Sequence, residues 1–330
     1  MRNKISGKSR VALVAVGIAL ALSLAWVAAD KSSASFLKNL EKALGQPQQQ
    51  QQQPAQPAQQ PQKAEPAQVE PPKKENRNQL IFSGITDVLS GSTEVSYEDE
   101  RVIGESLSLE GIKRYGKPVA NDALQKYVNL VGSAVARNSG RPGIPYNFVV
   151  VDSPLYNAFA APGGIIFITS TLLYNMHDES ELALVLAHEI GHVSKKHALQ
   201  SLQRAKLISG LGKLTAAGMK GDQGRKLQET IGGLQTVLFD KGLDQNMEFE
   251  ADAVALEYGY RTGYDPEGLS KVLNMLASKM AGAEHKGTWF STHPPISERQ
   301  KRIAALLAKY PDRATLAHLP DRFKTNVKVK

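Results

Sequence analysis

The sequence predicts an α+β fold that is mainly helical and contains a small β-sheet. Residues 121–138 carry apolar side chains at helical spacing behind Asn121, a residue type that commonly caps a helix start. Two short apolar runs, 146–152 and 163–173, are typical of buried strands, and the second continues into a helix. The connection between them, residues 153–164, is rich in turn-forming residues.

A further helix is predicted from Asp178 onward. Asp178 is followed three residues later by Glu181, a spacing typical of a capped helix start. An apolar stripe follows, formed by Leu182, Val185, Leu186, Ile190 and Val193. We therefore expect this helix to bury one face against the rest of the domain.

The chain divides into four predicted segments. Residues 1–29 combine a basic start with an uncharged run over 11–29, which is typical of a cleaved secretory signal peptide or, if retained, of a signal anchor. Residues 30–75 include a Pro/Gln-rich tract too poor in apolar side chains to fold, so we expect a disordered linker. Residues 76–310 form the globular domain, and residues 311–330 form a basic tail that we expect to be solvated.

The leader predicts where the globular domain resides. A bacterial-type signal sends it to the periplasmic side of the cell envelope, and the basic flank stays in the cytoplasm. The domain is then either secreted into the periplasm or anchored to the inner membrane by residues 11–29. Membrane association through this segment is the alternative to cleavage.

Charge and cysteine content exclude several classes of protein. The formal net charge is +8, but the excess lies in residues 1–75 and 309–330, whereas residues 76–308 are nearly neutral. A nucleic-acid-binding domain should carry its positive charge on a folded face, so we expect no nucleic-acid partner. The chain has no cysteine, which excludes disulfides, thiolate catalysis and cysteine-based zinc sites. Any metal site must use His, Asp or Glu.

The strongest chemical signal is the sequence HEIGH at residues 188–192. Residues four apart lie on one helix face, so His188 and His192 can direct two imidazoles at one metal ion. Glu189 reaches the same region and can accept a proton from a zinc-bound water. The uncharged residues around this sequence favour a buried zinc helix over a chance pair of surface histidines.

The third protein ligand is not a histidine of the same helix. The extended pattern HExxHxxGxxH requires glycine and histidine at positions 195 and 198, where the chain has Lys195 and Ala198. His197 is out of register with that pattern, and we expect an exposed side chain near the helix end. A carboxylate from another helix is the remaining option.

A downstream apolar-periodic segment, residues 246–260, offers such carboxylates. Glu248 and Asp252 are four residues apart and share a helix face, so one can bind the metal while the other accepts the ring N–H of a ligand histidine. Glu250 points about 160° away from Asp252 around the helix, and we expect it to be solvated.

These motifs resemble those of a known family. HEIGH followed by EFEAD at 248–252 is similar to the HExxH and ExxAD pair of the membrane-associated zinc endopeptidases that include HtpX, BepA and the CAAX prenyl proteases, which are of the gluzincin type. Residues 157–164, NAFAAPGG, resemble that family's edge strand ahead of the zinc helix, and residues 293–299, HPPISER, resemble its carboxy-terminal motif. Four motifs in order extend from about Glu98 to Ile303.

The resemblance implies a zincin-type metallopeptidase domain with one Zn²⁺ per chain and assigns roles to its residues. The implied zinc ligands are His188, His192 and Glu248, the implied base is Glu189, and Asp252 would orient a ligand histidine. His293 and Arg299 would lie near the zinc, where His293 stabilises the oxyanion or gates access. Substrate backbone would pair with the exposed strand edge at Asn157, Ala158, Phe159 and Ala160.

One departure from the family pattern concerns the residues ahead of Glu248. Family members often carry Ser-Arg there, whereas this chain has Asp244 and Gln245. The ligand set is intact, but no arginine is available at that position.

We therefore predict a zinc endopeptidase of the cell envelope that cleaves unfolded or misassembled envelope proteins through a zinc-bound water and a glutamate base. An envelope chaperone or assembly factor with a latent protease site is the alternative, with His293 in the open zinc position. A structural zinc protein would close its site with a fourth protein ligand and would not need Glu189. Residues 208–242, rich in Gly and Lys, are predicted either to cover the cleft as a mobile flap or to form packed helices.

Overall fold

The computed structural model describes residues 95–209, 232–233, 235–279, 288–293 and 296–328. The predicted leader and linker, and most of the predicted flap at 208–242, lie outside these residues. Within the described ranges, no helix combines the length and apolar character needed to cross a membrane.

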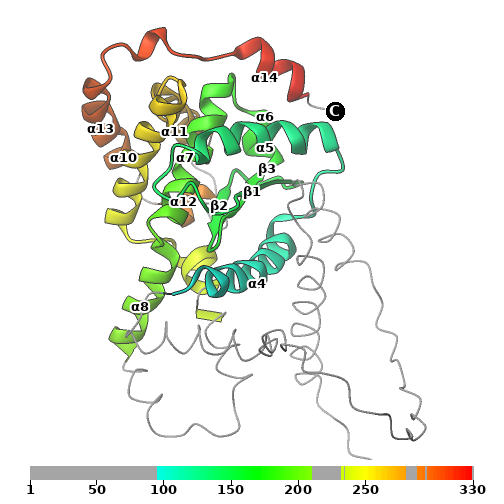
Figure 1. The fold of residues 1–330 in the computed structure, drawn as a ribbon, viewed down its shortest axis with the longest axis vertical. Coiled ribbons are helices and arrows are strands. Elements are labelled where there is room, and N and C mark those ends of the chain that lie inside the picture. The colour runs from blue at the N-terminus through cyan, green and yellow to red at the C-terminus, as the bar shows by residue number, and fades with distance from the viewer. Residues whose placement is uncertain (1–94, 210–231, 234, 280–287, 294–295, 329–330) are drawn as a thin grey trace, which may run out of the picture.

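A three-stranded sheet lies at the centre of the domain (Figure 1). Its strands are β1 (Asn147–Val151), β2 (Ala158–Ala161) and β3 (Ile165–Thr169), in the spatial order β1-β3-β2. β1 pairs with β3 in parallel, and β2 pairs with β3 antiparallel, with Phe159 opposite Phe167. Both predicted apolar runs therefore form strands, and β2 is an edge strand that precedes the HExxH helix in the chain.

Helices cover both faces of the sheet (Figure 1). α4 (Tyr97–Tyr115) covers one face, and α5 (Asp122–Ala136) and α7 (Glu179–Ser194) cover the other. Successive strand residues point to opposite faces, so Phe148 and Val150 pack with α5 and α7, whereas Val149 and Val151 pack with α4. The strands are consequently buried on both sides, which explains why their sequences are continuously apolar.

The turn between β2 and β3 depends on two glycines. Gly163 and Gly164 have φ angles of +80° and +97°, which glycine adopts without a Cβ penalty. A Cβ on Gly163 would lie only 2.7 Å from Cα of Arg101 in α4. This turn therefore fixes how closely α4 approaches the sheet.

The predicted helix starts are confirmed by their caps. The Asn121 side chain accepts a hydrogen bond from Leu124 N at 3.1 Å, and the Asp178 side chain accepts one from Glu181 N at 3.1 Å. These bonds satisfy backbone N–H groups that a helix start leaves unpaired. α7 is buried along almost its whole length, since helices surround it on the side away from the sheet.

The remaining helices complete a mainly helical α+β fold, as predicted. α10 (Gln245–Thr262) and α11 (Glu267–Lys279) pack against α7, and α13 (Ile296–Leu306) packs against both of them. Shorter elements are α6 (Ser170–Tyr174), α8 (His197–Ser209), the π-helix η2 (Thr236–Lys241), α12 (Trp289–Thr292), the 3₁₀ turns η3 (Leu307–Lys309) and η4 (Arg313–Thr315), and α14 (Pro320–Asn326).

The prediction of a solvated tail over 311–330 is wrong at two of the residues that the structure describes, whereas most of the others are exposed or half-buried. Phe323 in α14 and Val327 after it are 3% and 8% exposed and belong to the core formed with α5 and α7. Arg322 donates to Glu179, the first residue of α7. Two apolar side chains and the bond from Arg322 thus hold a mostly polar segment against the domain.

Candidate metal centre

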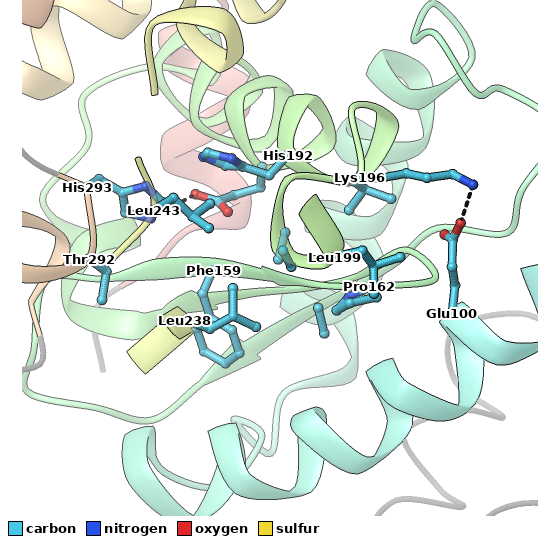
Figure 2. Close-up of a pocket in the computed structure, with 15 residues that line it drawn as sticks. Glu100, Phe159, Pro162, His192, Lys196, Leu199, Leu238, Leu243, Thr292 and His293 are labelled. Carbon is cyan, nitrogen blue, oxygen red and sulfur yellow. Dashed lines mark ion pairs between the residues drawn. The ribbon is translucent and has the colours of Figure 1, made fainter. Parts of the chain in front are cut away.

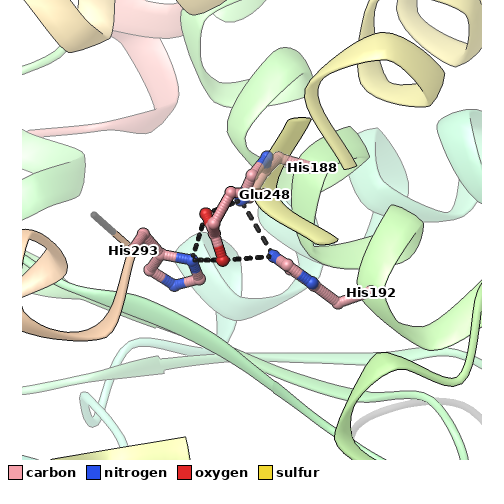
Figure 3. A group of neighbouring side chains, drawn as sticks. All are labelled: His188, His192, Glu248 and His293. Carbon is pink, nitrogen blue, oxygen red and sulfur yellow. Dashed lines mark hydrogen bonds and ion pairs between the residues drawn. The ribbon is translucent and has the colours of Figure 1, made fainter. Parts of the chain in front are cut away.

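α7 presents two histidines on one face. His188 and His192 are one turn apart and are 0% and 5% exposed. Their Nε2 atoms lie 3.0 Å apart and point to the same spot (Figure 3). Two converging imidazole nitrogens inside a core are typical of a metal site.

α10 brings a carboxylate to the same spot. Glu248 lies in the first turn of α10 and is fully buried, with Oε2 3.5 Å from His188 Nε2 and Oε1 3.5 Å from His192 Nε2. The two helices approach closely at Gly191, where a Cβ would lie 3.3 Å from Cα of Ala251. The Asp244 side chain, at the departure from the family pattern, caps α10 by accepting from Asn246 N at 2.8 Å.

His293 completes a cluster of four donors. Its Nδ1 lies 3.0 Å from Glu248 Oε2 (Figure 3). Its Nε2 lies 3.4 Å from the carbonyl oxygen of Ala158 in β2. One donor atom from each of His188, His192, Glu248 and His293 lies within 4.8 Å of the other three, and all four residues are buried. Imidazole nitrogens and a carboxylate oxygen are the donors that Zn²⁺ prefers when cysteine is absent, so this cluster fits a divalent metal.

The charges of the cluster suit a cation. Burial opposes ionisation of Glu248, but the surrounding histidines outweigh burial and hold its pKa well below the usual range. Burial lowers the pKa of His192. Burial and the Arg299 charge oppose protonation of His188, yet hydrogen bonds to Asp252 and Glu248 prevail and raise its pKa to about 9. The cluster therefore holds an ionised carboxylate and attracts positive charge.

Asp252 and Arg299 lie directly behind the cluster. Asp252 Oδ1 lies 3.0 Å from His188 Nδ1, the ring nitrogen that points away from the donor cluster. Arg299, fully buried in α13, donates to both Asp252 oxygens at 2.7 and 2.8 Å and to the His293 carbonyl at 3.2 Å. Its Nη1 also lies 3.3 Å from Glu248 Oε2. One guanidinium on α13 thus contacts two carboxylates of α10 and the segment that carries His293.

Glu189 is buried beside the cluster, and no residue that the structure describes forms a hydrogen bond with its carboxylate. Its exposed fraction is 0%, and neither carboxylate oxygen has a hydrogen-bond partner among the described residues. The Nε2 atom of His293 lies 3.7 Å from Oε1 of Glu189, which is too far for a hydrogen bond. Burial raises the pKa of Glu189, which makes the carboxylate a stronger base. Such an unpartnered buried carboxylate is unusual outside a functional site.

A mainly apolar pocket adjoins Glu189 and His293 (Figure 2). Its lining residues come from β2, α4, α7, α8, η2 and α12, and they include Phe159, Ala160, Ala161, Pro162, Val193, Leu199, Leu238, Leu243 and Thr292. The ion pair between Glu100 and Lys196, at 2.9 Å, lies at one end of the pocket, opposite His293 in this view (Figure 2). Its cavity is about 20 Å³, so the space beside Glu189 and His293 is nearly closed in this structure.

The strand edge predicted to bind substrate is positioned beside the metal cluster, but it is not exposed. The most exposed of the residues 157–160, Ala160, is only 8% exposed. Asn157 is buried, and its carbonyl accepts from Thr169 Oγ1 at 2.9 Å, so it holds the end of β2 to β3. The prediction missed this burial because the sequence of an edge strand does not indicate which loops and side chains cover it in the folded protein.

The prediction that His197 is exposed is wrong. Its side chain is 0% exposed, and its Nδ1 lies 2.9 Å from Nδ1 of His192. Its Nε2 lies 3.3 Å from Glu250 Oε2, so Glu250 is half-exposed as expected but is also paired. The prediction assumed one continuous helix, whereas α7 ends at Ser194 and α8 begins at His197. The adjacent basic residues 195 and 196 are typical of a helix end and were the available signal.

Comparison with known proteins agrees with this site. The sequence model of the family described as "Peptidase family M48" matches residues 122–307, which are more than half of the chain. This span contains every residue of the donor cluster. The chain belongs to peptidase family M48. Its domain is accordingly a metallopeptidase domain, and the buried donor set is a site that can hold a divalent metal.

Several curated relatives share this region. A beta-barrel assembly-enhancing protease of Yersinia pestis is 30% identical over 218 residues, which cover 62% of this chain and 43% of that protein. The metalloprotease LoiP of Escherichia coli is 30% identical over 184 residues, 56% of this chain and 71% of LoiP. The mitochondrial metalloendopeptidase OMA1 of Bos taurus is 29% identical over 188 residues, 54% of this chain and 36% of OMA1. The match spans less than half of the assembly-enhancing protease.

Proposed function

We propose that this protein is a zinc-dependent endopeptidase of the bacterial cell envelope that cleaves unfolded or misassembled proteins. The observation that carries the proposal is Glu189, buried beside the donor cluster with both oxygens free of hydrogen bonds from described residues. A structural metal site has no use for such a group, whereas hydrolysis needs a base close to the attacking water. Membership of family M48 supports the same chemistry.

Three residues would bind the metal, and two others would orient one of the ligand histidines. His188, His192 and Glu248 form the two-imidazole, one-carboxylate set of catalytic zinc sites. When bound, Zn²⁺ supplies a Lewis acid that polarises a carbonyl and lowers the pKa of water to about 7. Asp252 accepts the Nδ1–H of His188, which leaves Nε2 as the ligand atom, and Arg299 holds Asp252 in place.

Glu189 would move the proton during cleavage. It accepts a proton from the water that attacks the peptide carbonyl carbon, and it returns that proton to the amine as the carbon–nitrogen bond breaks. The raised pKa of Glu189 suits both steps, because a stronger base takes the proton more readily and still releases it to an amine. His293, whose Nε2 lies 3.7 Å from Glu189, is close enough to hydrogen-bond the oxyanion of the tetrahedral intermediate.

Substrates would be extended segments of protein. β2 is an edge strand next to the cluster, and Phe159 and Ala160 line the apolar pocket beside Glu189. An extended peptide can pair with such an edge only if its own backbone is free of secondary structure. Because β2 is buried here, binding requires the groups that cover it, including His293 at the Ala158 carbonyl, to move aside.

The location and substrate class rest on two further observations. Residues 1–29 have the pattern of a secretory signal or anchor, which supports export to the periplasmic side of the envelope. The relatives named beta-barrel assembly-enhancing protease support misassembled envelope proteins as substrates.

The test compares Glu189→Gln with the wild-type chain in cleavage of an unfolded protein such as casein, and measures zinc content in both. We expect a rate loss of about 10²- to 10⁴-fold with zinc content unchanged. Glu257→Gln is the matched control, because Glu257 is a half-exposed carboxylate on α10 paired with Arg261, and it should cleave normally. Wild-type cleavage by Glu189→Gln would refute the mechanism.

A second function, that of a chaperone or assembly factor with a latent protease, is favoured by one observation. His293 is the fourth member of the donor cluster and bonds to Glu248, so it is placed to occupy the coordination position that substrate needs. Under this alternative, His293→Ala should raise cleavage above wild type. Under the oxyanion role, the same change should lower it by about 10²-fold or more. Suppression of client aggregation by Glu189→Gln, insensitive to a chelator, would further support the chaperone.

A further inference from the structure

A chain of three side chains leads from the metal cluster to the protein surface. His192 Nδ1 lies 2.9 Å from His197 Nδ1, and His197 Nε2 lies 3.3 Å from Glu250 Oε2. Lys195 Nζ lies 2.8 Å from the other oxygen of Glu250. Both histidines are buried, and Glu250 is 47% exposed.

The contact between the two histidines is produced by a break in the helix. In a continuous helix, residues five apart point about 140° away from each other and do not meet. Here Lys196 adopts a φ of 56°, a left-handed conformation that is uncommon for a non-glycine residue. This reversal between α7 and α8 turns His197 back toward His192. The chain thus adopts an unfavourable backbone conformation at the point that creates the contact.

If His192 binds a metal, only one placement of the ring protons satisfies every hydrogen bond between His192, His197 and Glu250. His192 Nε2 faces the cluster, 3.0 Å from His188 Nε2, and a nitrogen that binds a metal carries no proton. A neutral His192 then carries its proton on Nδ1 and donates it to Nδ1 of His197. His197 must in turn carry its proton on Nε2, where the Glu250 carboxylate accepts it. Each proton has one donor and one acceptor.

We propose that His197 is a positioning residue for the metal ligand His192, with Glu250 holding His197 in the required tautomer. This inference rests on the proposed function, because it requires that His192 binds the metal through Nε2. It gives the two ligand histidines different supports: a buried carboxylate, Asp252, behind His188, and a neutral imidazole backed by a half-exposed carboxylate behind His192. Hydrogen-bond partners of this kind fix ring orientation and ligand basicity.

A role in packing alone predicts different behaviour. His197 is buried next to Ala198 and Leu199, and an apolar side chain of similar size could fill its place. His197→Leu retains bulk and removes the acceptor. His197→Asn has less bulk but places an amide oxygen close to the position of Nδ1. A positioning role therefore predicts that Asn works better than Leu, and a packing role predicts the reverse.

The test measures zinc affinity of the purified chain by competition with a chromophoric chelator, for the wild type, His197→Leu, His197→Asn and Glu250→Gln. We expect His197→Leu to weaken zinc binding about 10- to 100-fold. His197→Asn should bind zinc with most of the wild-type affinity. Glu250→Gln should weaken binding measurably. Glu257→Gln, a carboxylate of similar exposure on the same helix with its own basic partner, should not. The visible spectrum of the Co²⁺-loaded chain should change in His197→Leu, because the His192 ring is no longer held.

Three results would overturn the inference: zinc binding by His197→Leu within about threefold of wild type, equal losses in His197→Leu and His197→Asn, or no difference between Glu250→Gln and Glu257→Gln. If His197→Leu does not fold, Glu250→Gln still decides, since its side chain reaches the surface. Failure of the proposed function looks different: the wild type itself would then bind zinc no better than His188→Ala, and Glu189→Gln would cleave normally.

Discussion

Arg299 offers the sharpest test of how the site is held together. It is fully buried and forms two hydrogen bonds with Asp252, one with the His293 carbonyl, and a 3.3 Å contact with Glu248. Arg299→Met removes the charge and keeps an unbranched side chain. Two buried carboxylates are then left without their cation, and breaking a buried ion pair in this way costs about 3–5 kcal/mol.

The predicted loss is large enough to measure by thermal unfolding. For a domain of roughly 150–250 residues, 1 kcal/mol shifts the melting temperature by about 2–4 °C, so Arg299→Met should melt about 6–20 °C below wild type. Chelator should be present, because a metal that binds only the folded state would raise the melting temperature of both proteins.

Two further variants separate the charge from the packing. Arg302→Met is the matched control on α13, since Arg302 is 53% exposed, pairs with Glu298, and should shift stability by about 1 kcal/mol or less. Adding Asp252→Asn to Arg299→Met removes one of the two carboxylate charges that the guanidinium had offset and should recover part of the lost stability. A melting temperature for Arg299→Met equal to that of Arg302→Met would show that the buried pair does not stabilise the domain.

Three other predictions concern the frame around the site. Burial opposes ionisation of Glu179, but bonds from Arg322 and two tyrosines hold its pKa below the ordinary glutamate value of 4.5, so its stabilising effect is present above about pH 4.5 and lost as pH falls. In urea unfolding, the free energy of unfolding of Arg322→Met should therefore be about 1 kcal/mol lower than that of the wild type near pH 7, and this difference should disappear in acid. Gly104→Ala should destabilise by about 1–3 kcal/mol in the same assay, because its Cβ would lie 1.8 Å from the Pro162 carbonyl oxygen; wild-type stability would show that α4 can shift freely. Phe323→Ala should lower the free energy of unfolding by about 3–5 kcal/mol, because Phe323 in α14 is part of the core. An unchanged free energy of unfolding would show that the tail is solvated.

Local signals in the sequence predicted most of the fold. The caps at Asn121 and Asp178 depend on residues three positions apart, and strands β1 and β3 each depend on a run of four apolar residues, so neither requires knowledge of distant contacts. The same holds for His188 and His192, which one helix turn brings together.

Contacts between distant elements were accessible only in part. Spacing alone left Glu248 and Asp252 as equal candidates for the metal, and only the resemblance to a family distinguished them. The structure separates them by geometry, with Glu248 facing Nε2 of His188 and Asp252 facing Nδ1 of the same ring. Two residues on one helix face thus reach opposite sides of one imidazole.

The errors had a common physical origin. His197 and the residues after 310 were interpreted from composition and uninterrupted periodicity, but their positions depend on single backbone or packing events. A left-handed Lys196 returns His197 to the core, and Phe323 anchors a segment whose other residues are mostly polar. Events at one residue leave no periodic pattern in a sequence.

The bond between Arg322 and Glu179 has a consequence for biosynthesis. Glu179 is the first residue of the helix that carries HEIGH, and Arg322 lies in the last helix that the structure describes. During synthesis, every metal donor is therefore part of the nascent chain before α14, which completes the packing around α7, has been made. We expect the domain to reach its stable form only after residues 320–327 have left the ribosome, so that a partly made chain is not yet a competent protease.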